Sequence, residues 1–159
     1  MKAIIYFGNL GTTAKAATLL AEQLSGCSIY DGTKDFFLDY ALCEDLIFGV
    51  NVRMGRFNKK FLKFYKKLKK KNLNCRISAF IIGADVNKRS TYLSMMEALL
   101  PEDSKVAFFG GEFNLEQAKG LSRRVLLSCI DDFERKKLPL PALFPDAITA
   151  FADRIEKKY

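Results

Sequence analysis

The stretch "YFGNLGTTAKAATLLAEQL", residues 6–24, joins the end of an apolar run to a turn with two glycines and then to a helical pattern. The apolar run predicts a strand over residues 2–7, buried on both faces of a sheet. A helix is predicted from residue 12 to residue 24 because one helical stripe holds Ala14, Ala17, Leu20, Ala21 and Leu24. Strand, glycine turn and helix in this order can form a site for a nucleoside triphosphate, a dinucleotide or a mononucleotide.

The alternation of apolar runs and helical patterns continues along the chain. Further strands are predicted at 28–30, 45–50, 76–84 and 105–111, and further helices at 56–70, 88–100, 115–130 and from 145 onward. Strands separated by such helices predict an α/β three-layer sandwich, with a five-stranded parallel sheet in the order 2-1-3-4-5. We expect residues 1–159 to form a single domain, because this length suits one hydrophobic core.

Composition excludes several kinds of catalytic site. The chain has no histidine, which excludes a Ser-His-Asp triad, Cys-His catalysis and His-bound zinc. Its four cysteines lie far apart without metal-ligand spacing, so we expect free thiols. Neither a signal peptide nor an apolar run long enough for a membrane helix is found, and a cytoplasmic protein is expected. An enzyme of this composition would take its chemistry from a cofactor.

The net charge of +8 has one local source. Residues 59–71, "KKFLKFYKKLKKK", hold eight lysines and no acid. Without these eight, the 26 basic residues fall to 18, which equals the number of acidic residues. The run predicts a helix with lysines on one face and aromatic residues on the buried face. The side with the lysines would remain in solvent, or would dock onto an acidic redox partner or an anionic membrane. Binding to nucleic acid is not favoured, because the aromatic rings on the buried side could not stack on bases.

The first loop does not fit a triphosphate site. Such a loop requires a lysine directly after its last glycine, whereas Gly11 is followed by threonine and the next lysine is Lys15. A dinucleotide loop requires three glycines, and only Gly8 and Gly11 are present. Asp31 stands where a ribose-binding acid would lie, so the dinucleotide alternative stays open.

A monophosphate site requires neither the lysine of a triphosphate loop nor the third glycine of a dinucleotide loop. Backbone amides at a helix N-terminus bind the dianion, and threonine hydroxyls can add further donors. Gly11, Thr12 and Thr13 supply such a set, although the same residues could form only a tight turn with a helix cap. Two more strands end in glycine-bearing segments, "GVNVRMG" (49–55) and "FFGGEFN" (108–114), which could form loops beside the same site.

These three segments resemble the flavodoxin-domain family that includes menaquinone-dependent protoporphyrinogen oxidase. The resemblance lies in "YFGNLGTTAKAA", in "DLIFGVNVRMGRFNKKFLKF" and in "AFFGGEF", and it covers roughly residues 2–130. It implies a flavodoxin-like fold and a noncovalently bound FMN. Asn51 replaces a usual serine, and Met54 stands where an aromatic residue often stacks on the flavin ring.

The resemblance also implies which residues would contact the cofactor. The phosphate would be held by Asn9, Leu10, Gly11, Thr12 and Thr13. Along the flavin ring would lie Val50, Asn51, Val52, Arg53, Met54 and Gly55, with the backbone near Gly55 close to flavin N5. The far edge would be closed by Gly110, Gly111 and Glu112.

Two functions are expected from these observations. In the first, the chain is an FMN flavoprotein that acts in electron transfer or as an oxidoreductase. Its partner would be a redox protein or a small-molecule acceptor, including a quinone- or porphyrin-related one. In the second, it is an interaction module of the same shape that binds no FMN and docks through Lys59–Lys71. The flavin would carry the redox step, so neither a catalytic side chain nor a metal is expected.

Overall fold

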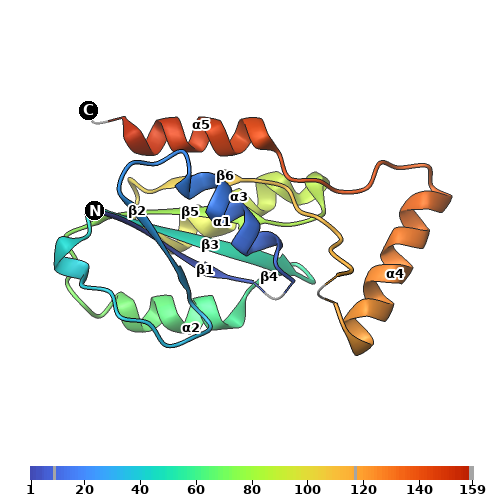
Figure 1. Cartoon of the computed structure of the whole chain (residues 1–159), viewed down its shortest axis with the longest axis horizontal. Helices are drawn as coiled ribbons and strands as arrows, with labels where there is room; N and C mark the ends of the chain where they lie inside the picture. The colour runs from blue at the N-terminus through green and yellow to red at the C-terminus, as the bar shows by residue number, and fades with distance from the viewer. Residues whose placement is uncertain (9, 117, 158–159) are drawn as a thin grey trace.

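Residues 1–8, 10–116 and 118–157 are described by the structure, a computed structural model. Five parallel strands form the central sheet in the order β2-β1-β3-β5-β6, which confirms the predicted order (Figure 1). These strands are β1 (Lys2–Phe7), β2 (Cys27–Asp31), β3 (Asp45–Arg53), β5 (Arg76–Ile82) and β6 (Lys105–Phe108). A short sixth strand, β4 (Arg56–Phe57), pairs antiparallel with the end of β3 and is absent from the sequence prediction.

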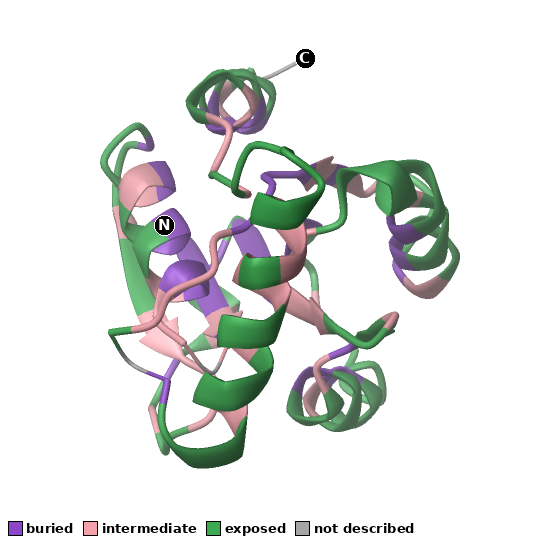
Figure 2. Ribbon diagram, turned by 90° about the vertical axis from the view of Figure 1, so that its right-hand side faces the viewer, coloured by how far each residue is buried: buried purple, intermediate pink, exposed green. Residues whose placement is uncertain are grey.

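Helices cover both faces of the sheet, as predicted. One layer contains α1 (Thr12–Ala21) and α5 (Pro145–Glu156), and the other contains α2 (Lys59–Leu68) and α3 (Arg89–Leu99). Neighbouring residues of β1 point into different layers: Ile4 packs in the core with α1 and α5, and Ile5 packs in the core with α2 and α3. Figure 2 shows the buried residues on the strands and on the inner sides of the helices. Burial on both faces explains the continuous apolar runs.

Helix α1 ends at Ala21, three residues before its predicted end. Two helices begin later than predicted, for reasons visible in the backbone. The helix predicted at 56–70 begins only at Lys59, because Arg56 and Phe57 extend β3 as a hairpin. The helix predicted at 115–130 is α4 (Gly120–Arg135). Gly120 has a φ of +59°, a left-handed conformation through which a right-handed helix cannot continue.

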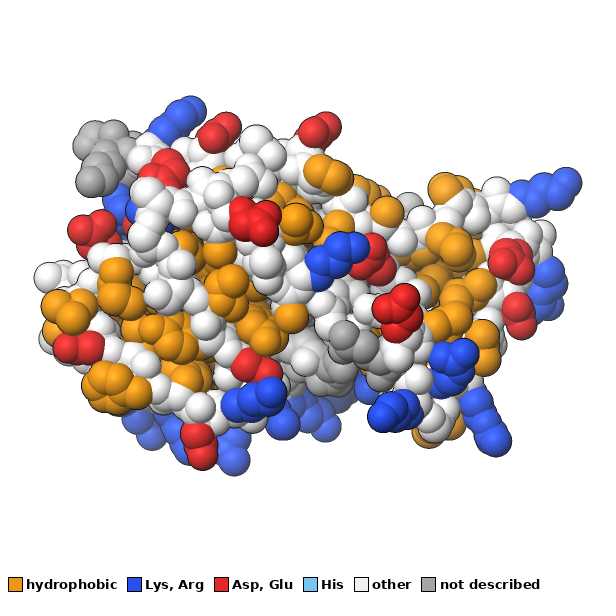
Figure 3. All heavy atoms as spheres, in the orientation of Figure 1, with side chains coloured by type: hydrophobic (Ala, Val, Ile, Leu, Met, Phe, Trp, Pro, Cys, Tyr) orange, Lys and Arg blue, Asp and Glu red, His pale blue; other side chains and the backbone are white. Residues whose placement is uncertain are grey.

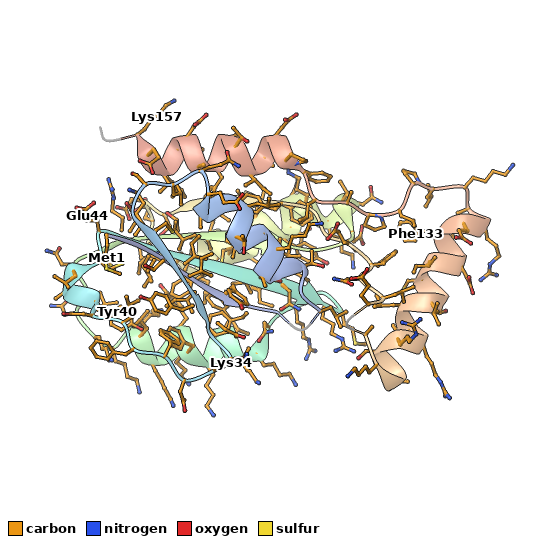
Figure 4. The ribbon with its side chains drawn as sticks, in the orientation of Figure 1. Met1, Lys34, Tyr40, Glu44, Phe133 and Lys157 are labelled. Atoms are coloured by element: carbon orange, nitrogen blue, oxygen red, sulfur yellow. The ribbon has the colours of Figure 1, made fainter. Side chains whose placement is uncertain are left out.

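Helix α4 stands away from the sheet (Figure 1), and none of its residues is buried. Its contact with the body includes Phe133, whose ring packs edge-on against Phe113 at 5.1 Å between centroids (Figure 4). Arg123 Nη1 also donates a 2.8 Å hydrogen bond to the carbonyl of Leu115. No helix within the described residues has both the length and the hydrophobicity to cross a bilayer.

The connection between β2 and β3, residues 32–44, contains only a short 3-10 turn, η1 (Tyr40–Leu42). It is held against the α2 side of the core by alternate residues. Leu38 is buried and Phe36 packs against the core, whereas Phe37 between them is 86% exposed. Alternation of this kind is a property of extended chain, in which neighbouring side chains point in opposite directions.

The end of α5 is tied to the loop before β2 through a carboxylate. Glu156 accepts a 2.8 Å hydrogen bond from the Ser25 amide, which lowers the pKa of Glu156 below its ordinary value. The Ser25 hydroxyl and the Lys2 ammonium act in the same direction. A lowered folded-state pKa contributes stability above the unfolded-state value, and that contribution is lost as the pH falls through the folded-state value.

Glu156→Gln is therefore expected to lower the free energy of unfolding at pH 7 and to have little effect at pH 3. Urea unfolding at the two pH values measures this difference. Glu22→Gln, at an exposed glutamate on the end of α1, is the control and should change neither value. An equal loss at both pH values for Glu156→Gln would show that its charge does not carry the effect.

Candidate functional site

The carboxyl ends of the parallel strands meet at one edge of the sheet and bring the predicted loops together. Phe7, the last residue of β1, pairs with Val50 in β3, and Asn51 pairs with Ile82 at the end of β5. Ile81 in β5 in turn pairs with Phe108, the last residue of β6. The loops after β1 and β6 and the segment after β5 therefore begin at the same edge, where β3 continues past Asn51. In open α/β sheets this edge is where ligands bind, at the point where the strand order reverses.

The first loop presents buried polar groups at the start of α1. Gly11 has a φ of +85° and occupies the N-cap position, so no side chain caps α1. Thr12 is 6% exposed, and its buried hydroxyl has no hydrogen-bond partner among the described residues. Thr13 is 2% exposed and lies against Gly8, where an added Cβ would be 2.4 Å from its hydroxyl oxygen. A buried hydroxyl without a hydrogen-bond partner, such as that of Thr12, costs about 1–3 kcal/mol of stability. A bound phosphate that accepts a hydrogen bond from it would remove this cost.

The resemblance assigns two more residues of this segment of the sequence to the phosphate. Leu10 is partly buried beside the N-cap. Asn9, which the resemblance also assigns to the phosphate, lies outside the described residues.

The second loop is a tight β-hairpin. Arg53 in β3 pairs with Arg56 in β4, and the turn consists of Met54 and Gly55, with φ values of +53° and +76°. Positive φ at both turn positions is the geometry of a type I′ hairpin. The side chain of Met54 is 93% exposed at the tip. The turn therefore brings Met54 and Gly55 out beyond the sheet edge.

The residues at the base of the hairpin have structural contacts. Val50 is completely buried, backbone included, so it presents no surface to a ligand, and Val52 packs against the core. Asn51 accepts a 2.9 Å hydrogen bond from Asn58 Nδ2, and its carbonyl accepts one from the Asn58 amide at 3.1 Å. Asn58 Oδ1 in turn accepts a hydrogen bond from the Lys60 amide and caps α2. One side chain thus fixes both the hairpin and the helix that follows it.

Asn58→Ala is expected to lower the free energy of unfolding by about 1–2 kcal/mol, through loss of the helix cap and of the bond to Asn51. Urea unfolding measures the change. Asn58→Asp keeps the cap and loses only the side-chain bond to Asn51, so its cost should be smaller. Asn72→Ala, at an exposed asparagine beyond α2, is the control. An equal effect of Asn58→Ala and Asn72→Ala would contradict this role for Asn58.

The third loop packs closely on the end of β5. The carbonyl of Gly110 accepts a 2.9 Å hydrogen bond from the Gly83 amide, and Gly110 has a φ of +78°. An added Cβ on Gly111 would lie 2.8 Å from the Gly83 carbonyl carbon. This close approach gives both loop glycines a packing role. Glu112 continues toward α1 and pairs with Lys15 at 3.1 Å.

The segment after β5 is a part of the edge that the sequence prediction did not include. Gly83 lies between the hairpin and the third loop, and an added Cβ there would be 3.7 Å from Cβ of Val52. Asp85 follows and accepts a hydrogen bond from the Asn87 amide at the start of the 3-10 turn η2 (Val86–Lys88). Burial, to which the charge of Asp85 adds, raises the pKa of Tyr92. The sequence feature that could have predicted this segment as part of the site is its position directly after a buried central strand.

Positive charge surrounds the hairpin. A surface hollow of about 600 Å³ lies beside it, lined by Arg53, Arg56, Lys59 and Lys60 together with Met54 and Phe57. No acidic residue in the described part of the chain lines this hollow. An anionic compound is therefore the kind of molecule that the surroundings of the hairpin attract.

Asp31, the candidate ribose-binding acid, is engaged in its own turn. Its Oδ1 accepts hydrogen bonds from the amide and the hydroxyl of Thr33, at 2.9 and 2.7 Å, and its Oδ2 pairs with Lys34 at 3.8 Å. Burial alone would raise the pKa of Asp31, but these hydrogen bonds and the charges of Lys34 and Lys60 lower it. These contacts hold Asp31 Oδ1 within its own turn and leave Oδ2 with the ion pair to Lys34.

The cysteines do not form a redox centre. All four are free, with Cys43 buried and the others partly buried. Burial raises the pKa of the Cys27 and Cys43 thiols to about 11, so both are protonated at neutral pH and are poor nucleophiles.

Comparisons with known proteins agree with this architecture. A family model described as flavodoxin domain matches residues 3–131. The crystal structure of oxidised flavodoxin 1 from Bacillus cereus superimposes with a TM-score of 0.51 and 14% identity, over 84% of this chain and 96% of that one. A protein of Bacteroides eggerthii named as a candidate flavoprotein gives a TM-score of 0.49 and 13% identity, over 84% of this chain and 98% of that one. A comparison with curated proteins finds no match.

The match to the family model runs from β1 into α4, so it includes all three predicted loops and the segment after β5. Helix α5 lies beyond the match and completes one layer of the sandwich through Ile148, Phe151 and Ile155. The chain belongs to the flavodoxin domain family.

Proposed function

We propose that this chain binds FMN without a covalent link at the carboxyl edge of its sheet and acts as a redox flavoprotein. The observation that carries the proposal is the buried hydroxyl of Thr12, which has no partner among the described residues and stands at the uncapped start of α1. A phosphate dianion there would accept hydrogen bonds from this hydroxyl and from the first amides of the helix. Membership in the flavodoxin domain family supports the same ligand.

The charges around the first loop suit this ligand. Glu112 would repel a phosphate, but Lys15 pairs with it at 3.1 Å and offsets its charge. Gly11, Thr12 and Thr13 would hold the phosphate. The hairpin tip with Met54 and Gly55, together with the segment after β5, would lie along the ring.

A bound flavin would supply the ability to accept and release electrons or hydride. The task of this chain is then to hold the phosphate, orient the ring and attract the partner. The cationic hollow beside the hairpin would favour an anionic partner, either a redox protein with an acidic surface or a small-molecule acceptor with carboxylates. Among small-molecule acceptors, we propose a quinone- or porphyrin-related compound.

The experiment is to measure the absorbance and the melting temperature of the purified protein with and without added FMN. Protein that carries flavin should be yellow and release FMN on denaturation. At an FMN concentration of 100 times Kd, the stabilisation is about 2.7 kcal/mol, which raises Tm by about 5–10 °C for a chain of this size. A colourless protein whose Tm does not respond to FMN, or responds only to NAD, would contradict the proposal.

A further inference from the structure

The outer side of α2 and the three residues that follow it carry a row of positive side chains. We define the lysine face as Lys59, Lys60, Lys63, Lys66, Lys67, Lys69, Lys70 and Lys71, all of which are exposed. Phe61, Tyr65 and Leu68 point the other way and are buried. Figure 3 shows cationic side chains gathered along the lower margin of the molecule, where α2 lies in Figure 1. Lys34, labelled in Figure 4, lies along the same margin.

The charge of the lysine face is largely not offset by acidic side chains of the described residues, although Lys60 is close enough to Asp31 to lower the pKa of that carboxyl. No residue of the face forms an ion pair with a described acidic side chain, whereas Lys15, Lys34 and Lys136 each do. Lys69 and Lys71 instead lie over the rings of Tyr65 and Tyr40, at 5.8 and 5.5 Å from the centroids. The face is therefore available to an external anion.

An exposed aromatic ring stands beside this face. Phe37 is 86% exposed on the loop that runs along α2, and it lines the same surface hollow as Phe64 and Lys71. Its neighbour Phe36 packs against Tyr30 and Phe64, with ring centroids 5.2 and 6.0 Å apart, which holds the loop in place. The ring of Phe37 is thus presented outward by an anchored loop.

We propose that α2 and Phe37 dock this protein onto an anionic lipid membrane, as a peripheral contact. Lysines are flexible point charges that suit a field of lipid headgroups, and the ring beside them can enter the apolar boundary. Of the rings within α2, Phe61 and Tyr65 are buried and Phe64 is partly buried, so among the rings of this surface only Phe37 could stack fully on a base. A single exposed ring does not supply the successive stacking platforms typical of single-strand nucleic acid binding, which disfavours nucleic acid. Lys59 and Lys60 also line the hollow beside the hairpin, so the docking surface adjoins the candidate site.

Cosedimentation with vesicles of phosphatidylcholine and phosphatidylglycerol tests the proposal, with pure phosphatidylcholine vesicles as the neutral reference. The protein should bind the anionic vesicles, bind the neutral ones much more weakly, and dissociate as salt is raised. The triple variant Lys63→Gln, Lys66→Gln, Lys67→Gln should bind roughly 100-fold more weakly, because each lysine near the surface is worth about fivefold. The matched triple variant Lys88→Gln, Lys119→Gln, Lys157→Gln loses the same net charge from exposed positions elsewhere and should bind nearly as well as the natural protein.

The contribution of the ring is tested separately. Phe37→Ser should weaken binding to anionic vesicles roughly tenfold, and Leu121→Ser, at a 75% exposed leucine of α4, should not. Absence of vesicle binding, equal losses for the two triple variants, or an unchanged affinity of Phe37→Ser would overturn the proposal. Binding to an RNA probe or to an acidic protein without binding to anionic vesicles would also overturn it. These measurements need no flavin, so their failure would leave FMN binding untouched.

Discussion

Thr12→Asp is expected to weaken FMN binding at least 100-fold, which corresponds to about 2.7 kcal/mol. Thr12 is the first residue of α1, and the residue is only 6% exposed beside the proposed phosphate position. A carboxylate there would replace a donor by a negative charge held against a dianion, away from the screening of bulk water. Titration of FMN, followed by flavin fluorescence, measures the affinity.

Two further variants separate the phosphate contact from an effect on the helix. Thr18→Asp places the same charge on an exposed position of α1 and should leave the affinity within about twofold, because surface charge is screened. Thr12→Val removes the hydroxyl without changing the shape of the side chain. It should weaken FMN binding while leaving the FMN-free protein equally or more stable, since the buried hydroxyl has no described partner. A Thr12→Asp variant that binds FMN normally would remove the first loop from the site.

Phe61→Ala is expected to lower the free energy of unfolding by about 3–5 kcal/mol. Phe61 is completely buried on the inner side of α2. Its ring centroid lies 5.6 Å from that of Phe7, 5.3 Å from that of Phe48 and 5.9 Å from that of Tyr65. Removing the ring leaves a cavity between α2 and the sheet that the rigid strands cannot close. Urea or guanidinium unfolding gives the change.

Phe37→Ala is the matched control for this prediction. The same atoms are removed from a side chain that is 86% exposed, so the change should stay within about 0.5 kcal/mol. Because Asn58 links the start of α2 to the hairpin, Phe61→Ala should also loosen the hairpin and weaken FMN binding. Similar losses of stability in the two variants would show that the aromatic cluster is not the core of this layer.

The sheet could be predicted from the sequence because its central strands are buried on both faces. Segments such as "DLIFGV" and "RISAFIIGA" are apolar at nearly every position, which fixes them as strands without a periodicity argument. β4 could not be predicted in this way. A strand of two residues is too short to show an alternation of apolar and polar side chains. Phe57 also continues the apolar stripe of α2, so the helix was predicted to begin too early. Asn58 was the signal for the true start, since asparagine is a preferred N-cap.

The candidate site could be predicted only where the backbone needs a glycine, because a glycine can be recognised in the sequence. Gly8 and Gly11 mark the first loop because one lies against Thr13 and the other takes a positive φ. The segment after β5 was missed because only Gly83 marks it, and its place beside the hairpin follows from strand order. Conversely, Val50 was expected at the ring from its place in a motif, although the alternation of β3 directs its side chain into the core.

The most direct measurement compares the affinities of the natural protein for FMN and for riboflavin, which differ by the phosphate alone. If the first loop holds that phosphate, FMN should bind at least about 100-fold more tightly, as expected for loss of several charge-assisted hydrogen bonds. Thr12→Asp should reduce this ratio to near one. Equal binding of FMN and riboflavin by the natural protein, or no binding of either, would contradict a phosphate site at the start of α1.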